Sequence, residues 1–119
     1  AFKKSFEPLL TGEGVPFVNN PDFEKYEGQP YFVSEFGGAL GWPADRKAPD
    51  SEIEDFYRRF EAQVSTLLDN PKMCAFCYTQ LVDVYQENNG IYLFDRGEKF
   101  DIERLRKIVS RKAAIETED

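Results

Sequence analysis

Two almost continuously apolar runs, separated by an amphipathic helix, constrain the fold of this chain more than any other feature. The runs are Tyr31–Phe36, which Gly37-Gly38 closes, and Met73–Val82. Strands that are apolar on both faces are typical of parallel sheets, because helices cover such sheets on each side. The pattern therefore predicts two buried strands that pair in parallel.

The segment between the runs predicts a long helix. Ser51 and Glu54 form a capping-box signature, and Asp69-Asn70-Pro71 ends the segment. Apolar residues at helical spacing form one stripe. The stripe consists of Ile53, Phe56, Tyr57, Phe60, Val64, Leu67 and Leu68. A strand, a crossover helix and a parallel strand together indicate α/β architecture.

The remaining segments complete a β-α-β-α order but leave the sheet incomplete. Residues 1–30 are an irregular lead-in, residues 31–112 carry the regular elements, and residues 113–119 are a frayed acidic tail. Ile91–Phe94 is a short extended piece. Asp101 caps a last helix with Ile102, Leu105, Ile108 and Val109 inward. A sheet of two strands has unpaired edges, so we expect the chain to be one piece of a larger sheet.

Composition excludes several classes of function. The 119 residues include 22 acidic and 15 basic ones, a net charge of -7, which argues against nucleic acid as a partner. No apolar run is long enough to span a membrane. The absence of histidine removes Ser-His-Asp, Cys-His and HExxH chemistry. We expect no cofactor and no metal site, and the sequence leaves the cellular compartment open.

Glu35 is the first candidate site residue. It lies near the end of an apolar strand and directly precedes Phe36-Gly37-Gly38. Ligand sites of α/β proteins form at the carboxyl ends of parallel strands, and the glycines allow a sharp turn beside the carboxylate. The pattern alone leaves open whether Glu35 faces a site or bulk solvent.

Three further residues are candidates for substrate binding. Tyr78 and Gln80 share one parity near the end of the second run, where they could face a ligand, although the pattern alone favours Tyr78 as a core residue with its hydroxyl satisfied. Trp42 could stack on a sugar or pack on the fold. Two other groups carry less weight. Cys74 and Cys77 are expected as core thiols rather than a redox pair, and the loop charges Asp83, Glu87, Asp95 and Arg96 are expected to be solvated.

Two blocks of sequence resemble glycoside hydrolase family 2, which includes beta-galactosidases and beta-glucuronidases. Gly28-Gln-Pro-Tyr-Phe-Val-Ser-Glu-Phe-Gly-Gly38 is similar to strand seven of that family's barrel, and Phe76-Cys-Tyr-Thr-Gln-Leu-Val-Asp-Val-Tyr-Gln-Glu-Asn-Asn-Gly90 to strand eight and the loop after it. Phe94-Asp-Arg-Gly-Glu-Lys-Phe100 resembles the closing stretch, with Gly97-Glu98 where Lys-Pro is common. Together the blocks cover roughly residues 15–112.

The resemblance implies strands seven and eight of a (β/α)₈ TIM barrel and a retaining mechanism with Glu35 as nucleophile. By position, Tyr78 matches the aromatic residue on which the sugar stacks, and Gln80 is a pocket residue. The acid/base glutamate of the family follows an asparagine on strand four, and this chain has no matching strand. We therefore expect the isolated chain to be inactive, with carbohydrate as the substrate of its parent protein.

Two other classes of function remain open. A non-catalytic interaction module would use its open sheet edges to recruit a partner or a second copy, and in isolation we expect a homo-oligomer. A small dithiol oxidoreductase would use Cys74 and Cys77.

Overall fold

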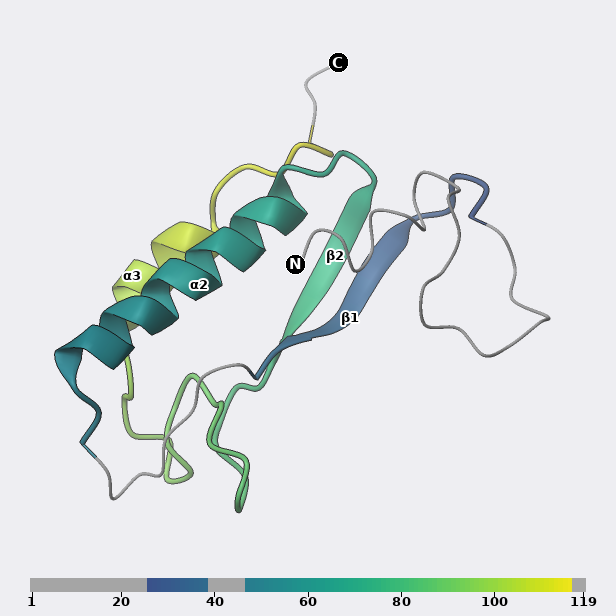
Figure 1. Ribbon diagram of the computed structural model, residues 1–119. Coiled ribbons are helices and arrows are strands. Elements are labelled where there is room, and N and C mark those ends of the chain that lie inside the picture. Colours follow the sequence, from purple (N-terminus) through teal and green to yellow (C-terminus); the bar gives the residue numbers. More distant parts are fainter. Residues whose placement is uncertain (1–25, 39–46, 117–119) are drawn as a thin grey trace.

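The computed structural model describes residues 26–38 and 47–116 and contains four elements (Figure 1). These are β1 (Tyr31–Gly37), α2 (Asp50–Leu68), β2 (Met73–Thr79) and α3 (Ile102–Val109). The two strands pair in parallel. The β-α-β-α order and the α/β class are thus confirmed. Most of the lead-in and Trp42 lie outside the described residues.

Helix α2 buries the apolar stripe that its sequence predicts. Phe56, Tyr57, Phe60, Val64, Leu67 and Leu68 are all buried. The expected capping box is wrong, because the helix begins two residues earlier than its signature predicts. Pro49 is the N-cap, its carbonyl accepts from the N–H groups of Glu52 and Ile53, and Ser51 lies inside the first turn without a capping bond.

Helix α3 follows its predicted cap. The Asp101 side chain accepts from the Arg104 N–H at 3.0 Å, and Leu105 is buried. Val109 is exposed, against expectation, because Leu105 and Ile108 take the inward face of this short helix. The start of the expected frayed tail is also attached, since the Ala114 N–H donates to the Leu68 carbonyl at 2.6 Å.

Aromatic and charged side chains join α2 to the segment that carries α3. The rings of Phe56 and Phe100 stack with their centroids 3.9 Å apart. Arg104 lies over the Tyr57 ring at 3.9 Å and donates to both carboxylate oxygens of Glu54, at 2.7 and 3.0 Å. These contacts hold both helices on one side of the sheet (Figure 1), where they form the core with the strands.

The prediction that both faces of the strands are buried is wrong. Phe36, Met73 and Phe76 pack against the helices, whereas Phe32 on β1 is 53% exposed. Within the described ranges no element covers the second face of the sheet, which explains why apolar side chains there meet solvent. In this part of the chain no helix is long and apolar enough to cross a membrane.

Each strand carries one extra residue, and the two irregularities compensate. The first shift falls between Tyr31 and Phe32 and leaves Cys74 of β2 unmatched, while the second falls between Val33 and Phe36 in β1. The pairs are Tyr31↔Met73, Phe32↔Ala75, Val33↔Phe76, Phe36↔Tyr78 and Gly37↔Thr79. The offset between partners is therefore the same at both ends of the sheet, and the carboxyl ends of the strands are level.

Strand β2 ends at Thr79 rather than at Val82. The carbonyls of Gln80 and Leu81 accept from the N–H groups of Ile91 and Tyr92, at 3.0 and 2.9 Å. Residues 80–82 therefore pair with the expected extended piece instead of with β1. That piece forms isolated bridges and no strand of its own.

Candidate functional site

Glu35 lies where its sequence position predicts, near the carboxyl edge of the parallel sheet. It is exposed, and it immediately precedes the buried Phe36. Phe36 packs in the core on the helix side of the sheet, whereas the exposed Glu35 lies on the face opposite α2. The carboxylate is therefore presented to solvent on the uncovered side.

The two glycines after Glu35 make the turn that the sequence predicts. Gly37 has φ +109° and Gly38 has φ +74°, both in the left-handed region. A Cβ on Gly37 would lie 2.4 Å from Cε2 of Tyr78, and one on Gly38 would lie 3.3 Å from Nδ2 of Asn89. The end of β1 thus contacts both β2 and the loop that follows β2.

Tyr78 shares no face with Glu35. Its ring meets Phe36 and Phe60 edge to face, with centroids 5.5 and 5.4 Å apart, and its hydroxyl donates to the Asn89 carbonyl at 3.0 Å. Burial, and secondarily the negative charge of Asp83, raise the pKa of Tyr78 to about 12. Tyr78 is therefore a core residue with a satisfied hydroxyl, and its expected role as a stacking platform beside Glu35 does not fit this geometry.

The reason lies in the extra residue of β1. Between Val33 and Phe36 the strand advances three residues while β2 advances two. Residues Ser34 and Glu35 are both exposed there, and Phe36 returns to the helix side opposite Tyr78. Simple alternation along each strand could not place these two side chains correctly.

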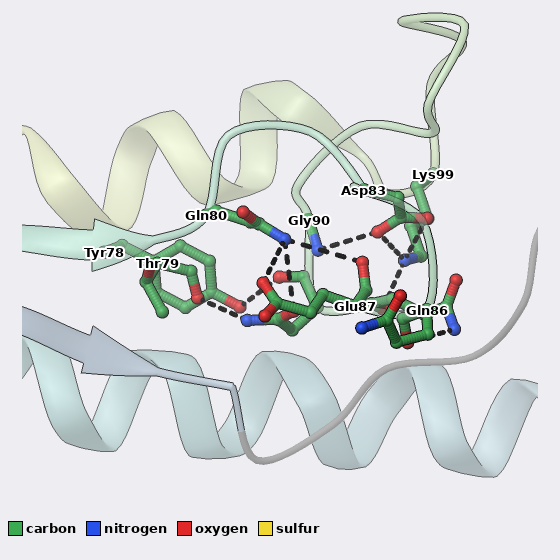
Figure 2. A network of polar contacts seen from close by, with 10 residues as sticks. Tyr78, Thr79, Gln80, Asp83, Gln86, Glu87, Gly90 and Lys99 are labelled. Atoms are coloured by element: carbon green, nitrogen blue, oxygen red, sulfur yellow. Dashed lines mark hydrogen bonds and ion pairs between the residues drawn. The ribbon is translucent and has the colours of Figure 1, made fainter.

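Gln80 belongs to a polar network in the loop after β2 (Figure 2). The peptide bond between Thr79 and Gln80 is cis. The Gln80 amide donates to a carboxylate oxygen of Glu87 at 3.3 Å and to the side-chain oxygen of Asn89 at 3.4 Å. Asn89 in turn donates to the Thr79 carbonyl at 3.0 Å. Gln80 is thus directed into the loop.

A buried ion pair stabilises this loop, and the sequence pattern did not predict it. Asp83 is expected to be solvated but is 3% exposed, and Lys99 Nζ lies 2.8 and 2.9 Å from its two oxygens. The Gly90 N–H donates to Asp83 at 2.8 Å, and Lys99 also donates to the Asn88 carbonyl at 2.7 Å. Sixteen residues separate the partners, so no local spacing pattern could reveal the pair.

The other loop charges agree with expectation. Glu87, Asp95 and Arg96 are all exposed. The loop after β2 therefore has a buried charged centre and a charged outer surface, and Figure 2 shows the polar groups of the centre directed toward one another. Such a fully bonded centre fixes the loop in one arrangement.

Cys74 and Cys77 are exposed rather than part of the core. The reason is again the uncovered face of the sheet. Three residues along a strand separate Cα atoms by about 10 Å, and a disulfide needs less than about 7 Å. The spacing therefore gives no support to a dithiol oxidoreductase. In the described part of the chain, no group of three or more Asp, Glu or Cys residues is placed to hold a metal ion.

Comparison with known proteins adds no family. Neither the family models nor the curated proteins that were searched give a match to this chain. The class that the fold and the site define is a small α/β unit with a two-stranded parallel sheet, and an exposed carboxylate lies at the carboxyl edge of that sheet.

Proposed function

We propose that this chain forms strands seven and eight, with their helices, of the (β/α)₈ barrel of a retaining glycosidase similar to family 2. Glu35 is its nucleophile. The observation that carries the proposal is the position of Glu35, exposed at the carboxyl edge of a parallel strand and followed by Gly37 and Gly38 in left-handed conformations. Barrel enzymes carry their catalytic groups at this edge.

The uncovered side of the sheet supports the same proposal. In a closed barrel, helices pack on the outside and the other face of each strand points into the interior. Here the helices cover one face, and Glu35 and the exposed Phe32 lie on strand β1 outside that cover. Six further strands would bury Phe32 and place the carboxylate at the mouth of the barrel.

The chemistry of Glu35 would proceed in two steps. A carboxylate oxygen attacks the anomeric carbon of a bound sugar, and the glycosidic C–O bond breaks while a second carboxylic acid protonates the leaving oxygen. Water, deprotonated by that second carboxylate, then displaces Glu35 and restores its charge. We assign the second carboxylate to strand four of the barrel, so the 119-residue chain alone should not turn over substrate.

The test uses the full-length protein that carries this segment, assayed on nitrophenyl glycosides. Glu35→Gly should lower kcat by roughly 10⁴-fold or more. Sodium azide should restore turnover, because its small anion fits the space of the missing carboxylate. The product should be a glycosyl azide of the configuration opposite to that of the substrate, which identifies a nucleophile rather than an acid/base residue.

Glu61→Gln is the matched control, since Glu61 is exposed on α2, and it should retain full activity. Unchanged turnover in Glu35→Gly, or rescue without formation of the azide product, would contradict the assignment. Turnover by the 119-residue chain itself, absent from a Glu35→Gln variant, would show that the second carboxylate is not required from elsewhere.

One observation favours a second candidate, a module that assembles with itself. The exposed Phe32 and the open strands of a two-stranded sheet leave apolar surface that another copy could cover. We therefore propose that the isolated chain forms a homo-oligomer. For the parent protein, we propose carbohydrate as the partner, and neither nucleic acid nor a membrane. Light scattering that shows a monomer at high concentration, with the fold intact, would argue against the oligomer.

A further inference from the structure

Two exposed aromatic rings lie side by side on the turns that follow the sheet. Tyr85 is 85% exposed and Phe94 is 67% exposed, and their ring centroids are 6.4 Å apart with the planes tilted by 43°. Neither residue belongs to the core. Large aromatic side chains that remain this exposed mark interaction sites when they form a contiguous patch.

The turns that carry these rings are backbone-strained. Val84 and Glu87 exchange two backbone hydrogen bonds, at 3.0 and 2.9 Å, around a turn in which Tyr85 has φ +50°. The second turn, which follows Phe94, is closed by a bond from Leu93 N–H to the Gly97 carbonyl, and its Arg96 has φ +70°. A bulky residue with positive φ is uncommon and costs free energy that glycine would avoid. The ring of Tyr85 is therefore kept at a position where stability alone favours glycine.

The patch is carried by the loop that leaves the edge where Glu35 lies, and hydrogen bonds hold this loop in place. The buried pair of Asp83 and Lys99 adjoins the Val84–Glu87 turn, and the Asp83 N–H donates to the Tyr92 carbonyl at 3.0 Å. The same loop contacts the end of β1 through Asn89 and Gly38. Figure 1 shows this loop extending beyond the edge at which both strands end. Preorganised rings give affinity without a large ordering cost.

We infer that Tyr85 and Phe94 form a platform for a neutral oligosaccharide, on which a pyranose other than the one attacked by Glu35 stacks through its C–H face. This rests on the proposed function. The two rings expose about 300 to 400 Å², well below the ~800 Å² that each partner contributes to a stable protein interface. The exposed residues Gln86 and Glu87 follow Tyr85 directly in the chain, and they bring hydrogen-bonding groups, which sugar hydroxyls require, to the same turn.

In the experiment, the aromatic side chains of the 119-residue chain are isotopically labelled and their signals are observed by NMR. The neutral tetrasaccharides cellotetraose and β-1,4-galactotetraose are added in separate titrations. We expect millimolar binding with shifts of the Tyr85 and Phe94 ring signals. Tyr85→Ala and Phe94→Ala should each weaken binding at least 10-fold, and Tyr85→Trp should retain it. Phe32→Ala is the matched control, because Phe32 is an exposed ring on the sheet itself. This variant should bind the tetrasaccharides with the same affinity as the unaltered chain.

A second measurement separates binding from folding. Tyr85→Gly should raise the unfolding midpoint by about 4 °C, because the positive φ no longer carries a side chain, and should abolish sugar binding. A lower midpoint would show that the ring has a structural role and would overturn the inference. Equal affinity in all variants, no shift at 50 mM sugar, or ring shifts that depend only on protein concentration would overturn it as well.

Failure here is distinguishable from failure of the proposed function. Glu35→Gln should bind the tetrasaccharides as well as the unaltered chain does, because the platform lies outside the attacked sugar. In the full-length protein, Tyr85→Ala should lower kcat/KM on the tetrasaccharide and leave it unchanged on a nitrophenyl monoglycoside. Sugar binding without any glycosidase activity would refute the role of Glu35 alone, whereas activity without binding would refute the platform alone.

Discussion

Removal of the charge on Asp83 should be the most damaging single change in the loop after β2. Asp83→Asn keeps the shape of the side chain and an acceptor for the Gly90 N–H, which now lies 2.8 Å from a carboxylate oxygen. It removes the negative charge that lies 2.8 Å from the Lys99 ammonium, whose side chain is 2% exposed. Breaking one partner of a buried pair costs about 3 to 5 kcal/mol. A domain of this size has a total stability of roughly 6 to 18 kcal/mol.

The assay is urea unfolding followed by far-ultraviolet circular dichroism, in a double-mutant cycle. Lys99→Met should also be destabilising, because it leaves Asp83 buried and charged. The double variant Asp83→Asn/Lys99→Met contains neither charge. Its loss in the free energy of unfolding should therefore be smaller, by at least about 2 kcal/mol, than the sum of the losses in the two single variants. The control is Asp69→Asn, which removes an exposed ion pair with Arg111 at 2.9 Å and should cost less than about 1 kcal/mol.

A cycle that closes additively, to within about 0.5 kcal/mol, would refute this reasoning. It would mean that the two charges do not depend on each other for burial. The amide signal of Gly90 provides a local check, because its hydrogen exchange should accelerate in Asp83→Asn as the loop loses stability.

Two further predictions concern the sheet edge. The pKa of Tyr78 is raised to about 12, against an ordinary 10. The neutral hydroxyl therefore contributes to the stability of the folded state fully below pH 10, and this contribution is lost as pH rises toward 12. Between pH 9 and 11 the free energy of unfolding should fall by about 1 kcal/mol more in the unaltered chain than in Tyr78→Phe, and equal pH dependence in urea titrations would contradict the burial of the hydroxyl. Gly37→Ala should destabilise by more than about 2 kcal/mol, because its Cβ would meet the Tyr78 ring. Gly28→Ala has the same backbone strain in open space and should cost only about 1 kcal/mol, and similar thermal midpoints for the two variants would exclude the clash.

The elements that could be predicted from the sequence are those that depend on local pattern. The apolar stripe of α2 faces the core because its spacing matches the helical period, and Asp101 caps α3 because a side-chain acceptor in that position serves the free N–H groups. The place of Glu35 also follows from local signals, since a charged residue and two glycines after an apolar run mark the end of a strand.

The features that could not be predicted depend on residues that are distant in the sequence or on which face of the sheet the described segments cover. Cys74 and Cys77 are exposed because no described segment covers one face of the sheet, although their own run is apolar. Asp83 is buried because Lys99 reaches it from sixteen residues away. Glu35 lies on the face opposite Tyr78 because β1 carries one extra residue between Val33 and Phe36, and no alternation of apolar and polar letters records such a residue.

The matched irregularities of the two strands have a consequence for length variation. Deleting Ser34 would let β1 advance two residues between Val33 and Phe36, as β2 does there, and plain alternation would keep the carboxylate outward and Phe36 toward the helices. Deleting Cys74 would likewise remove the unmatched residue of β2. The two irregularities are therefore the places where either strand can lose a residue without exchanging its two sides, whereas a deletion elsewhere in the strand would shift the register.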